Sequence, residues 1–275
     1  MALITLTSEM GHQDYLVSAV KATLLGIDPG FTIVDVSHSI PAFNYPQAAY
    51  VCRNAFKHFP EYSYHLVLVN LFDRKPEQLL LAFHQNQYIL CADNGLLTMI
   101  LEEKPEMIIG IPLKSTEKTT IGIAAAMGRV AHELVNGTSI KDIGVPDVSY
   151  LEKNPLRPVV DDLGMEGKII FIDQFENVVV NITREEFERN RNGRKFQIIF
   201  KRDEVIDRIS QTYADAPEGE KLALFNSAGY LEIAINKGNA AGLFGLKGYN
   251  EKNGRVSAIL QNQLFYQTIR IHFEP

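Results

Sequence analysis

The sequence of 275 residues is poor in cysteine, since Cys52 and Cys91 are the only two. A fold held together by disulfides is therefore excluded, and we expect free thiols in a reducing compartment. Long hydrophobic runs are also missing: those at 66–69 and 121–127 are far shorter than the roughly 20 residues of a membrane span. No basic and apolar leader precedes the first β-prone residues, so we expect a cytoplasmic protein without a membrane partner.

Positive charge is not in excess either, because 27 lysines and arginines face 33 aspartates and glutamates, for a net charge of −6. A general phosphate-backbone binder normally carries a basic face, so we expect no nucleic-acid partner. The cysteines and the seven scattered histidines lack zinc-ligand spacing, and the sequence has no Walker loop and no nucleophile elbow. We therefore expect no metal site and no cofactor.

The first half of the chain alternates β-prone segments with segments of helical periodicity. Strands are expected at 3–7, 31–36, 65–69, 79–83, 88–91 and 107–111, and helices at 14–25, 46–59, 94–101 and 120–135. Strands interleaved with helices are typical of an α/β domain. For residues 1–150 we thus predict an α/β domain in which helices flank a mostly parallel sheet.

The second half changes character after a stretch rich in proline, aspartate and glycine, which places a linker at 151–166. Beyond it we expect strands at 168–173, 177–182, 196–201, 222–225, 231–235 and 267–273, and a single short helix at 185–190. Residues 226–229 separate two of these strands as a hairpin turn would. The sequence predicts a small all-β, barrel-like domain over residues 167–275.

Polar segments follow several strands of the first half. They lie at 7–14, 35–44, 70–75 and 92–98. In an open α/β sheet, loops at the carboxyl ends of the strands line the ligand crevice. Each segment alone can be an ordinary turn or helix cap, so it is their combination that indicates a ligand site.

Two turns of the second half carry groups suited to a nucleoside or an amino acid. Residues 171–177 place a carboxylate, a ring and an amide around one turn, and residues 224–234 with 238–241 add a hydroxyl and small residues. A carboxylate can bind an ammonium, a ring can stack on a base, and an amide can hydrogen-bond to a base edge. Plain hairpins built from turn-favouring residues remain the alternative.

Six segments of these loops and turns carry a resemblance to a known family. They read TSEMGHQD, IVDVSHSIPAFN, ADNGLLT, FIDQFENVVVNI, FNSAGYLEIA and GNAA, in the family's order. The chain resembles the S-adenosylmethionine (SAM) hydroxide adenosyltransferases, or SAM hydrolases, which are relatives of the SAM-dependent fluorinase and chlorinase. The resemblance implies an α/β domain followed by a β-barrel-like domain. It also implies a homotrimer that holds SAM between the N-terminal domain of one subunit and the C-terminal domain of its neighbour.

The resemblance also implies roles for individual residues. It implies that Asp173, Phe175 and Asn177 bind the methionine ammonium and the adenine, and that Ser227 and Ala228 bind the methionine carboxylate. Asn239 and Ala240 would make further contacts with the adenine. Phe43 would flank the ribose, and Glu9 would bind the ribose hydroxyls. The family has an aspartate where this chain has Glu9, which keeps the acceptor oxygens on a longer side chain.

The residues that handle water in the family are not retained. Asn70 stands at the position of the family's aspartate, the position of its arginine falls near Glu77 when no gap is inserted, and no histidine lies near residue 122. An asparagine can orient a water by hydrogen bonding but cannot accept its proton. We take Asn70, Asp73 and Arg74 as candidate catalytic residues, and His12 could complete a triad with Asp73 and Arg74.

These observations predict a SAM-binding protein that hydrolyses SAM to adenosine and methionine by attack of water or hydroxide on the ribose C5′. We expect slow turnover, because loss of an acid or base group typically costs ~10²–10⁴-fold in rate. A catalytically inactive SAM or adenosine sensor is the alternative. Altered chemistry on another nucleoside compound also stays open.

Overall fold

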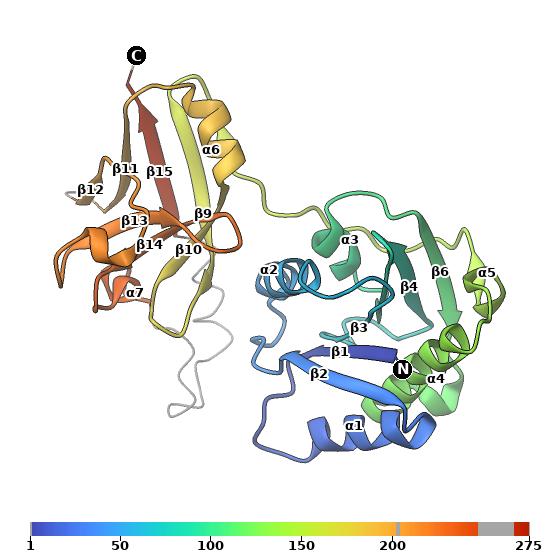
Figure 1. Cartoon of the computed structure of the whole chain (residues 1–275). Helices are drawn as coiled ribbons and strands as arrows, with labels where there is room; N and C mark the ends of the chain where they lie inside the picture. The colour runs from blue at the N-terminus through green and yellow to red at the C-terminus, as the bar shows by residue number, and fades with distance from the viewer. Residues whose placement is uncertain (1, 202–203, 247–266, 275) are drawn as a thin grey trace. The chain divides into compact units, whose positions relative to one another are not determined.

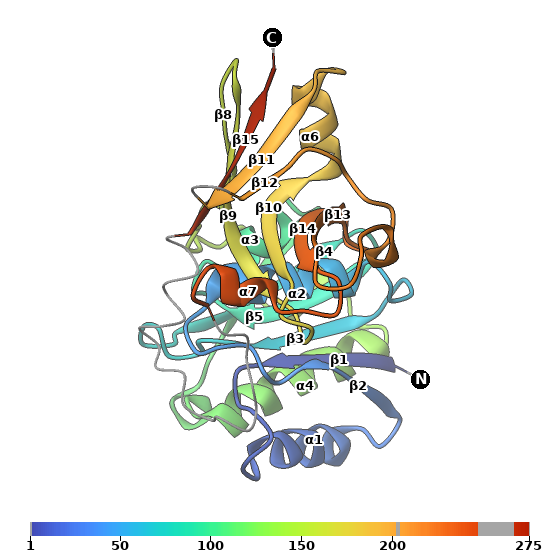
Figure 2. The same cartoon turned by 90° about the vertical axis from the view of Figure 1, so that its left-hand side faces the viewer.

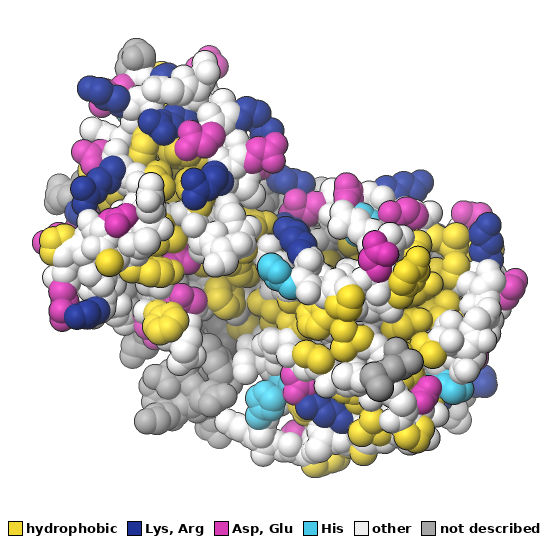
Figure 3. All heavy atoms as spheres, in the orientation of Figure 1, with side chains coloured by type: hydrophobic (Ala, Val, Ile, Leu, Met, Phe, Trp, Pro, Cys, Tyr) yellow, Lys and Arg dark blue, Asp and Glu magenta, His cyan; other side chains and the backbone are white. Residues whose placement is uncertain are grey.

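The computed structural model describes residues 2–201, 204–246 and 267–274. The chain divides into two compact units, an N-terminal unit (Met1–Pro155) and a C-terminal unit (Leu156–Pro275). Among the described helices, none has both the length and the apolar character to cross a membrane. On the face of the molecule that Figure 3 shows, side chains of both charge signs are intermingled.

The N-terminal unit is built on a seven-stranded sheet (Figure 1). Its strands, in spatial order, are β2 (Phe31–Ser37), β1 (Ala2–Ser8), β3 (Tyr64–Leu68), β5 (Gln87–Ala92), β4 (Gln78–His84), β6 (Met107–Pro112) and β7 (Val145–Pro146). Its helices are α1 (Leu16–Ile27), α2 (Tyr45–Phe56), α3 (Leu96–Leu101), α4 (Thr120–Val135) and α5 (Ile140–Ile143), with a 3₁₀ turn at Ser115–Glu117. The predicted strands and helices of the first half are all present, and the α/β class is confirmed.

Helices cover both faces of this sheet, with α1 and α4 on one side and α2 and α3 on the other (Figure 2). Strand β3 shows the consequence for the sequence, because its side chains alternate between two cores. Leu66 and Leu68 pack with the α1 and α4 side, whereas Val67 packs with the α2 and α3 side. A strand that is buried on both faces carries mostly apolar residues, which explains the continuous apolar run at 66–69.

The sheet is mixed rather than parallel throughout. Strands β2, β1, β3 and β5 run parallel, while β4, β6 and β7 pair antiparallel. The physical reason is the tight turn between β4 and β5, where Gln85 and Asn86 have φ of 47° and 59°. Two residues at positive φ form the turn that joins antiparallel strands, so β4 cannot cross over to a parallel position. The parallel strands are those whose following loops carry the polar segments.

The described residues of the C-terminal unit form strands, two short helices and a 3₁₀ turn. Its strands run in the order β12 (Glu204–Ile206), β11 (Phe196–Lys201), β15 (Thr268–Phe273), β9 (Gly164–Ile172), β10 (Val178–Thr183), β14 (Tyr230–Ile235) and β13 (Lys221–Phe225), with β8 (Val159–Val160) beside β9. The helices are α6 (Arg184–Arg191) and α7 (Ala240–Leu243), and the 3₁₀ turn is Tyr213–Asp215. The predicted strands are confirmed, whereas β8, β12 and α7 were not foreseen.

The two end strands of this sheet approach each other, because Glu204 of β12 forms an ion pair with Lys221 of β13. The sheet is thus nearly closed, and it encloses an apolar core around Phe187 and Phe273, both fully buried. The barrel-like architecture expected for the second domain is therefore confirmed.

The segment expected as a linker, 151–166, is largely tied to one unit or the other. Leu151 N donates to Asp93 Oδ1 at 2.8 Å, which holds this part of the chain on the N-terminal unit. On the other side, Asn181 Nδ2 donates to Leu156 O at 2.9 Å, and β8 and β9 begin at Val159 and Gly164. Buried polar side chains of each unit thus bind backbone groups of this segment.

Candidate functional site

The carboxylate of Glu9 joins the loops that follow three parallel strands. It accepts a hydrogen bond from Phe43 N at 3.1 Å and from Asn70 N at 2.8 Å. Phe43 and Asn70 both have positive φ, 63° and 46°, a region that non-glycine residues rarely adopt. Strained backbone of this kind persists only where the surroundings enforce it, and it gathers at functional sites. Each Glu9 oxygen keeps a further lone pair, so the carboxylate can still accept from a pair of hydroxyls.

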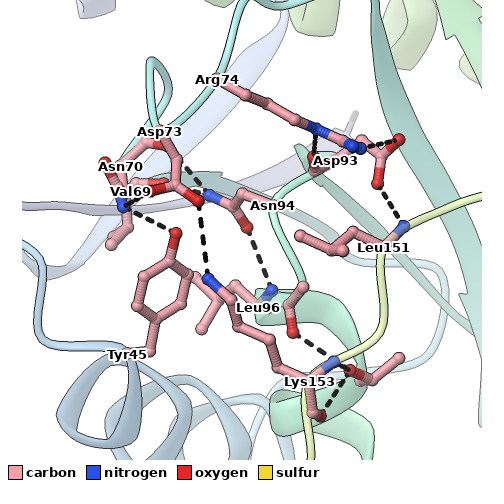
Figure 4. Close-up of polar contacts among 12 residues, drawn as sticks. Tyr45, Val69, Asn70, Asp73, Arg74, Asp93, Asn94, Leu96, Leu151 and Lys153 are labelled. Carbon is pink, nitrogen blue, oxygen red and sulfur yellow. Dashed lines mark hydrogen bonds and ion pairs between the residues drawn. The ribbon is translucent and has the colours of Figure 1, made fainter.

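The Asn70 side chain is held by two neighbours (Figure 4). Its Nδ2 donates to Tyr45 Oη at 2.6 Å and to Asp73 Oδ1 at 3.2 Å, and the residue is 5% exposed. Because both amide N–H bonds are used, the Asn70 amide can offer a water only its oxygen, which acts as an acceptor.

Tyr45 is the first residue of α2, and its hydroxyl meets two members of this group. Burial raises the pKa of Tyr45, and the negative charge of Asp73 raises it further. The phenol therefore stays protonated, so that it accepts from Asn70 and hydrogen-bonds to Asp73. Asn44 fixes the start of the helix, since its Oδ1 accepts from Gln47 N at 3.0 Å.

Asn94 fastens the end of β3 to the end of β5. Its Nδ2 donates to the carbonyls of Val69 and Asn70, both at 3.0 Å, and its Oδ1 accepts from Leu96 N at 3.0 Å. The ADNGLLT segment thus binds the backbone after β3 and also begins α3. These hydrogen bonds fix the position of Asn70 at the carboxyl end of β3.

Arg74 is bound to Asp93 and not to Asn70 or Asp73. Its Nη2 lies 2.6 Å from Asp93 Oδ2, and its Nε donates to Asp93 O at 2.9 Å. Gln78 Nε2 donates to the same Oδ2 at 2.8 Å and Leu151 N donates to Oδ1, so both oxygens of this buried carboxylate have donors. Asp73, Arg74 and Asp93 line a cavity of about 440 Å³ in the N-terminal unit.

His12 contacts a different partner from the one that sequence reasoning suggested. Its ring lies edge-on to that of His38, with centroids 5.1 Å apart. His38 is buried between Ser8 Oγ, at 2.7 Å from its Nδ1, and Asp35 Oδ1, at 3.1 Å from its Nε2, and burial lowers its pKa. With Arg74 on Asp93 and His12 on His38, the triad of His12, Asp73 and Arg74 is not formed.

Tyr45 and Lys153 belong to the Asn70 site although sequence reasoning did not single them out. Lys153 Nζ lies 3.6 Å from Asp73 Oδ2 and 3.5 Å from the centroid of the Tyr45 ring (Figure 4). The sequence gives little signal for either, because Tyr45 reads as a helix start and Lys153 as part of a linker. Only the folded chain brings them to Asn70.

In the C-terminal unit, Asp173, Phe175 and Asn177 form one turn, as their spacing indicates. Asp173 Oδ1 accepts from Phe175 N at 2.9 Å and from Asn177 N at 2.8 Å, while its Oδ2 accepts from Asn177 Nδ2 at 3.0 Å. The Phe175 ring is 77% exposed and so has a free face for stacking.

The start of α7 lies beside this turn, since Ala241 N donates to Glu176 O at 2.9 Å. The two residues expected to contact adenine, Asn239 and Ala240, directly precede Ala241. Asn239 caps the helix, because its Oδ1 accepts from Gly242 N at 2.6 Å. The structure therefore brings the segment 239–240 and the turn 173–177 together within the C-terminal unit.

The turn that carries Ser227 and Ala228 is shaped by Asn226, whose Oδ1 accepts from Ala228 N at 3.0 Å and from Tyr230 N at 3.2 Å. Asn226 also hydrogen-bonds to Glu232, a buried carboxylate that accepts from Tyr213 Oη at 2.7 Å. Burial raises the pKa of Glu232, and the negative charge of Asp173 adds to the effect. Sequence reasoning missed Glu232 and Tyr213.

Comparison with known proteins places both units in one family. Residues 4–144 match the model of the SAM hydroxide adenosyltransferase N-terminal domain, and residues 167–251 match that of the C-terminal domain.

Individual relatives agree over most of the chain. An (R)-S-adenosyl-L-methionine hydrolase of Thermus thermophilus is 28% identical over 254 residues, which covers 87% of this chain and 94% of that protein. One of Methanocaldococcus jannaschii is 25% identical, covering 88% and 91%. A fluorinase of an Actinoplanes species is 25% identical, covering 89% and 94%.

A solved structure shares the fold. The crystal structure of a conserved protein from Thermotoga maritima superposes with a TM-score of 0.75 at 24% identity, covering 98% of this chain and 99% of that one. The resemblance found in the motifs is thus confirmed over both units, and the chain belongs to the SAM hydroxide adenosyltransferase family.

Proposed function

We propose that the protein hydrolyses S-adenosyl-L-methionine to adenosine and L-methionine. The observation that carries the proposal is the Asn70 amide, held by Tyr45 and Asp73 next to the Glu9 carboxylate. This group lies at the carboxyl ends of parallel strands, where α/β proteins bind their ligands. Family membership and the names of the hydrolase relatives support the same substrate.

The reaction is a displacement at the ribose C5′ carbon. The water oxygen forms a bond to C5′ while the C5′–S bond breaks. The electron pair of the C5′–S bond goes to the sulfur, which turns the sulfonium into a neutral thioether. The leaving group needs no acid, because the sulfur already carries the positive charge. The protein must align the water with the C5′–S bond and keep other water away. We propose that SAM is the substrate and that no cofactor takes part.

The residues divide this work between them. The Asn70 oxygen accepts a hydrogen bond from one O–H of the water and so orients it, but the amide cannot take the proton. The neighbouring Asp73 carboxylate accepts the other hydrogen bond and receives the proton as the C–O bond forms. Arg74 takes no part in this scheme, because its guanidinium is bound to Asp93.

The same proposal extends to the substrate's other groups. Glu9 accepts from the ribose hydroxyls, Phe43 flanks the ribose, and the amino-acid and adenine ends bind to Asp173, Phe175, Asn177, Ser227, Ala228, Asn239 and Ala240. We propose that a homotrimer completes the site, with SAM between the N-terminal unit of one subunit and the C-terminal unit of its neighbour. The support for this arrangement is the motif resemblance. The two buried, unpaired cysteines are compatible with the cytoplasmic location that we also propose.

A SAM or adenosine sensor without turnover is the second candidate. Two observations favour it: residue 70 is an amide rather than a base, and Arg74 is committed to Asp93. Incubating the purified full-length protein with SAM separates the candidates, with adenosine and methionine followed by chromatography and binding by calorimetry. We expect binding and equimolar products. Binding without adenosine supports the sensor, and absence of binding contradicts both.

Replacing Asp73 with asparagine tests the assignment of the proton acceptor. We expect Asp73→Asn to lower the rate of adenosine release by about 10²–10⁴-fold, because the amide keeps the shape but cannot take a proton. SAM binding in calorimetry should persist. Asp142→Asn, at an exposed position of α5, is the matched control and should leave the rate unchanged. An unaltered rate in Asp73→Asn contradicts the assignment.

A further inference from the structure

Lys153 reaches the Asn70 site by a route that is fixed at three points. The first point is its backbone, which is clamped by Thr98 of α3. Lys153 N donates to Thr98 Oγ1 at 2.9 Å, and Thr98 Oγ1 donates to Lys153 O at 2.8 Å. A single hydroxyl thus satisfies both backbone groups of one residue and fixes where its side chain begins.

The second point is the aliphatic stem of Lys153, which passes directly over Gly95. A Cβ atom on residue 95 would lie 2.5 Å from Lys153 Cγ and 2.8 Å from its Cδ, closer than real contacts allow. Gly95 also has φ of +87°, where a side chain is strained. Glycine at this position therefore serves two purposes, the turn before α3 and the passage of the lysine.

The third point is the ammonium group, which meets Asp73 and Tyr45 together. Its nitrogen is 3.6 Å from Asp73 Oδ2 and 3.5 Å from the Tyr45 ring centroid, where the negative face of the ring attracts a cation. The two residues that it contacts are those that bind the Asn70 amide. Lys153 thereby closes a network drawn from the α2 start, the β3 loop and the segment before the second unit.

This network is poorly explained as a device for stability alone. The Lys153 and Asp73 side chains are 33% and 38% exposed, and ion pairs with that much access to water contribute little to folding. What the contacts do achieve is orientation, since they hold the carboxylate beside the amide that would share a water with it.

We propose that Lys153 is a positioning residue for the hydrolytic water, which it places by holding Asp73 against the Asn70 amide. The proposal rests on the hydrolase function proposed above. It predicts that Lys153 is needed for turnover but not for binding SAM. Because the substrate is a sulfonium cation, removing the ammonium also removes a like charge, so affinity for SAM should not fall.

Steady-state kinetics of three variants test this role. In Lys153→Met, kcat should fall about tenfold to a hundredfold, the scale that small misplacements of reacting groups cause, while KM for SAM does not rise. Lys153→Arg, which restores the charge, should recover most of kcat. Lys57→Met, which removes a lysine elsewhere in the N-terminal unit, is the control. An unchanged kcat, or a raised KM with no recovery by arginine, overturns the proposal.

A second measurement does not depend on turnover. Reductive methylation followed by mass spectrometry reports how readily each lysine amine reacts, with Lys57 as the internal reference. An ammonium held by a carboxylate and a ring should react several-fold more slowly in the wild type than in Asp73→Asn. Equal rates overturn the proposed anchoring. If Lys153 is protected but the wild type releases no adenosine, the hydrolase function fails while the anchoring stands.

Discussion

The two units build their polar sites in opposite ways. In the N-terminal unit the Asn70 group is assembled from distant segments: Glu9 binds Asn70 across 61 positions, and Asn70 binds Tyr45 across 25. In the C-terminal unit the two turns are shaped by local hydrogen bonds, since Asp173 binds Asn177 and Asn226 binds Tyr230 within four positions. A change in the first unit should therefore disturb several segments together, whereas one in the second should stay local.

Gly95→Ala should give the largest effect, because it breaks the long-range network at the passage of Lys153. The added Cβ meets the lysine stem and the positive φ is strained, so we expect a loss of about 1–2 kcal/mol of unfolding free energy. Displacement of Lys153 should also lower kcat about tenfold or more. Denaturant melts and adenosine release measure the two effects.

Gly137→Ala is the matched control for that experiment. Gly137 has φ of +90°, but a Cβ there meets nothing within 4 Å. It should lose similar stability and keep its activity. Equal loss of activity in both variants would show that strain in the backbone, not the displaced lysine, is responsible.

Arg74→Met should give an intermediate effect and one confined to stability. The variant leaves the buried Asp93 with Gln78 and Leu151 as donors but without its cation. The Arg74 side chain is half exposed, so screening by water limits the contribution of this ion pair to about 1 kcal/mol, and the melting midpoint should fall by a corresponding amount. We expect little change in kcat. A loss of kcat as large as in Asp73→Asn would return Arg74 to the catalytic residues.

Glu232→Gln should give the smallest effect and one that depends on pH. The pKa of Glu232 is raised in the folded state from its usual value of 4.5, mainly by burial. Its contribution to stability is therefore full at pH below that value and is lost as pH rises through the raised pKa. Relative to Glu232→Gln, the wild type should lose stability as the pH rises from about 4.5 through the raised pKa of Glu232. Thermal melts from pH 4 to neutral measure the difference, and parallel curves would contradict it.

The same contrast decides what the sequence could predict. Helix α4 was predicted with its bounds, because Thr119 caps its start, with Oγ1 accepting from Gly122 N, and Asn136 and Gly137 end it. The 171–177 turn was equally readable, since its hydrogen bonds lie within four positions. Such features depend on neighbours in sequence, which a single chain displays directly.

What could not be predicted depends on tertiary contacts. Lys153 lies 80 positions from Asp73 along the chain, yet the two side chains form an ion pair. The sequence does not determine whether Arg74 pairs with Asp73 or with Asp93, and the fold places Asp93 Oδ2 2.6 Å from its guanidinium. The antiparallel placement of β4 followed from two residues with positive φ, Gln85 and Asn86, in a link that the sequence showed only as polar. Propensity and periodicity carry no information on such choices.

The Glu9 clamp has a consequence for how the N-terminal unit reaches its native state. A carboxylate that bridges backbone amides 34 and 61 positions away can form both bonds only after β1, β2 and β3 have come together. The site around Glu9 therefore cannot form before these three strands have assembled. A nucleoside that binds at this site would bind the folded protein and not the unfolded chain. By mass action it should therefore raise the melting temperature in proportion to the logarithm of its concentration.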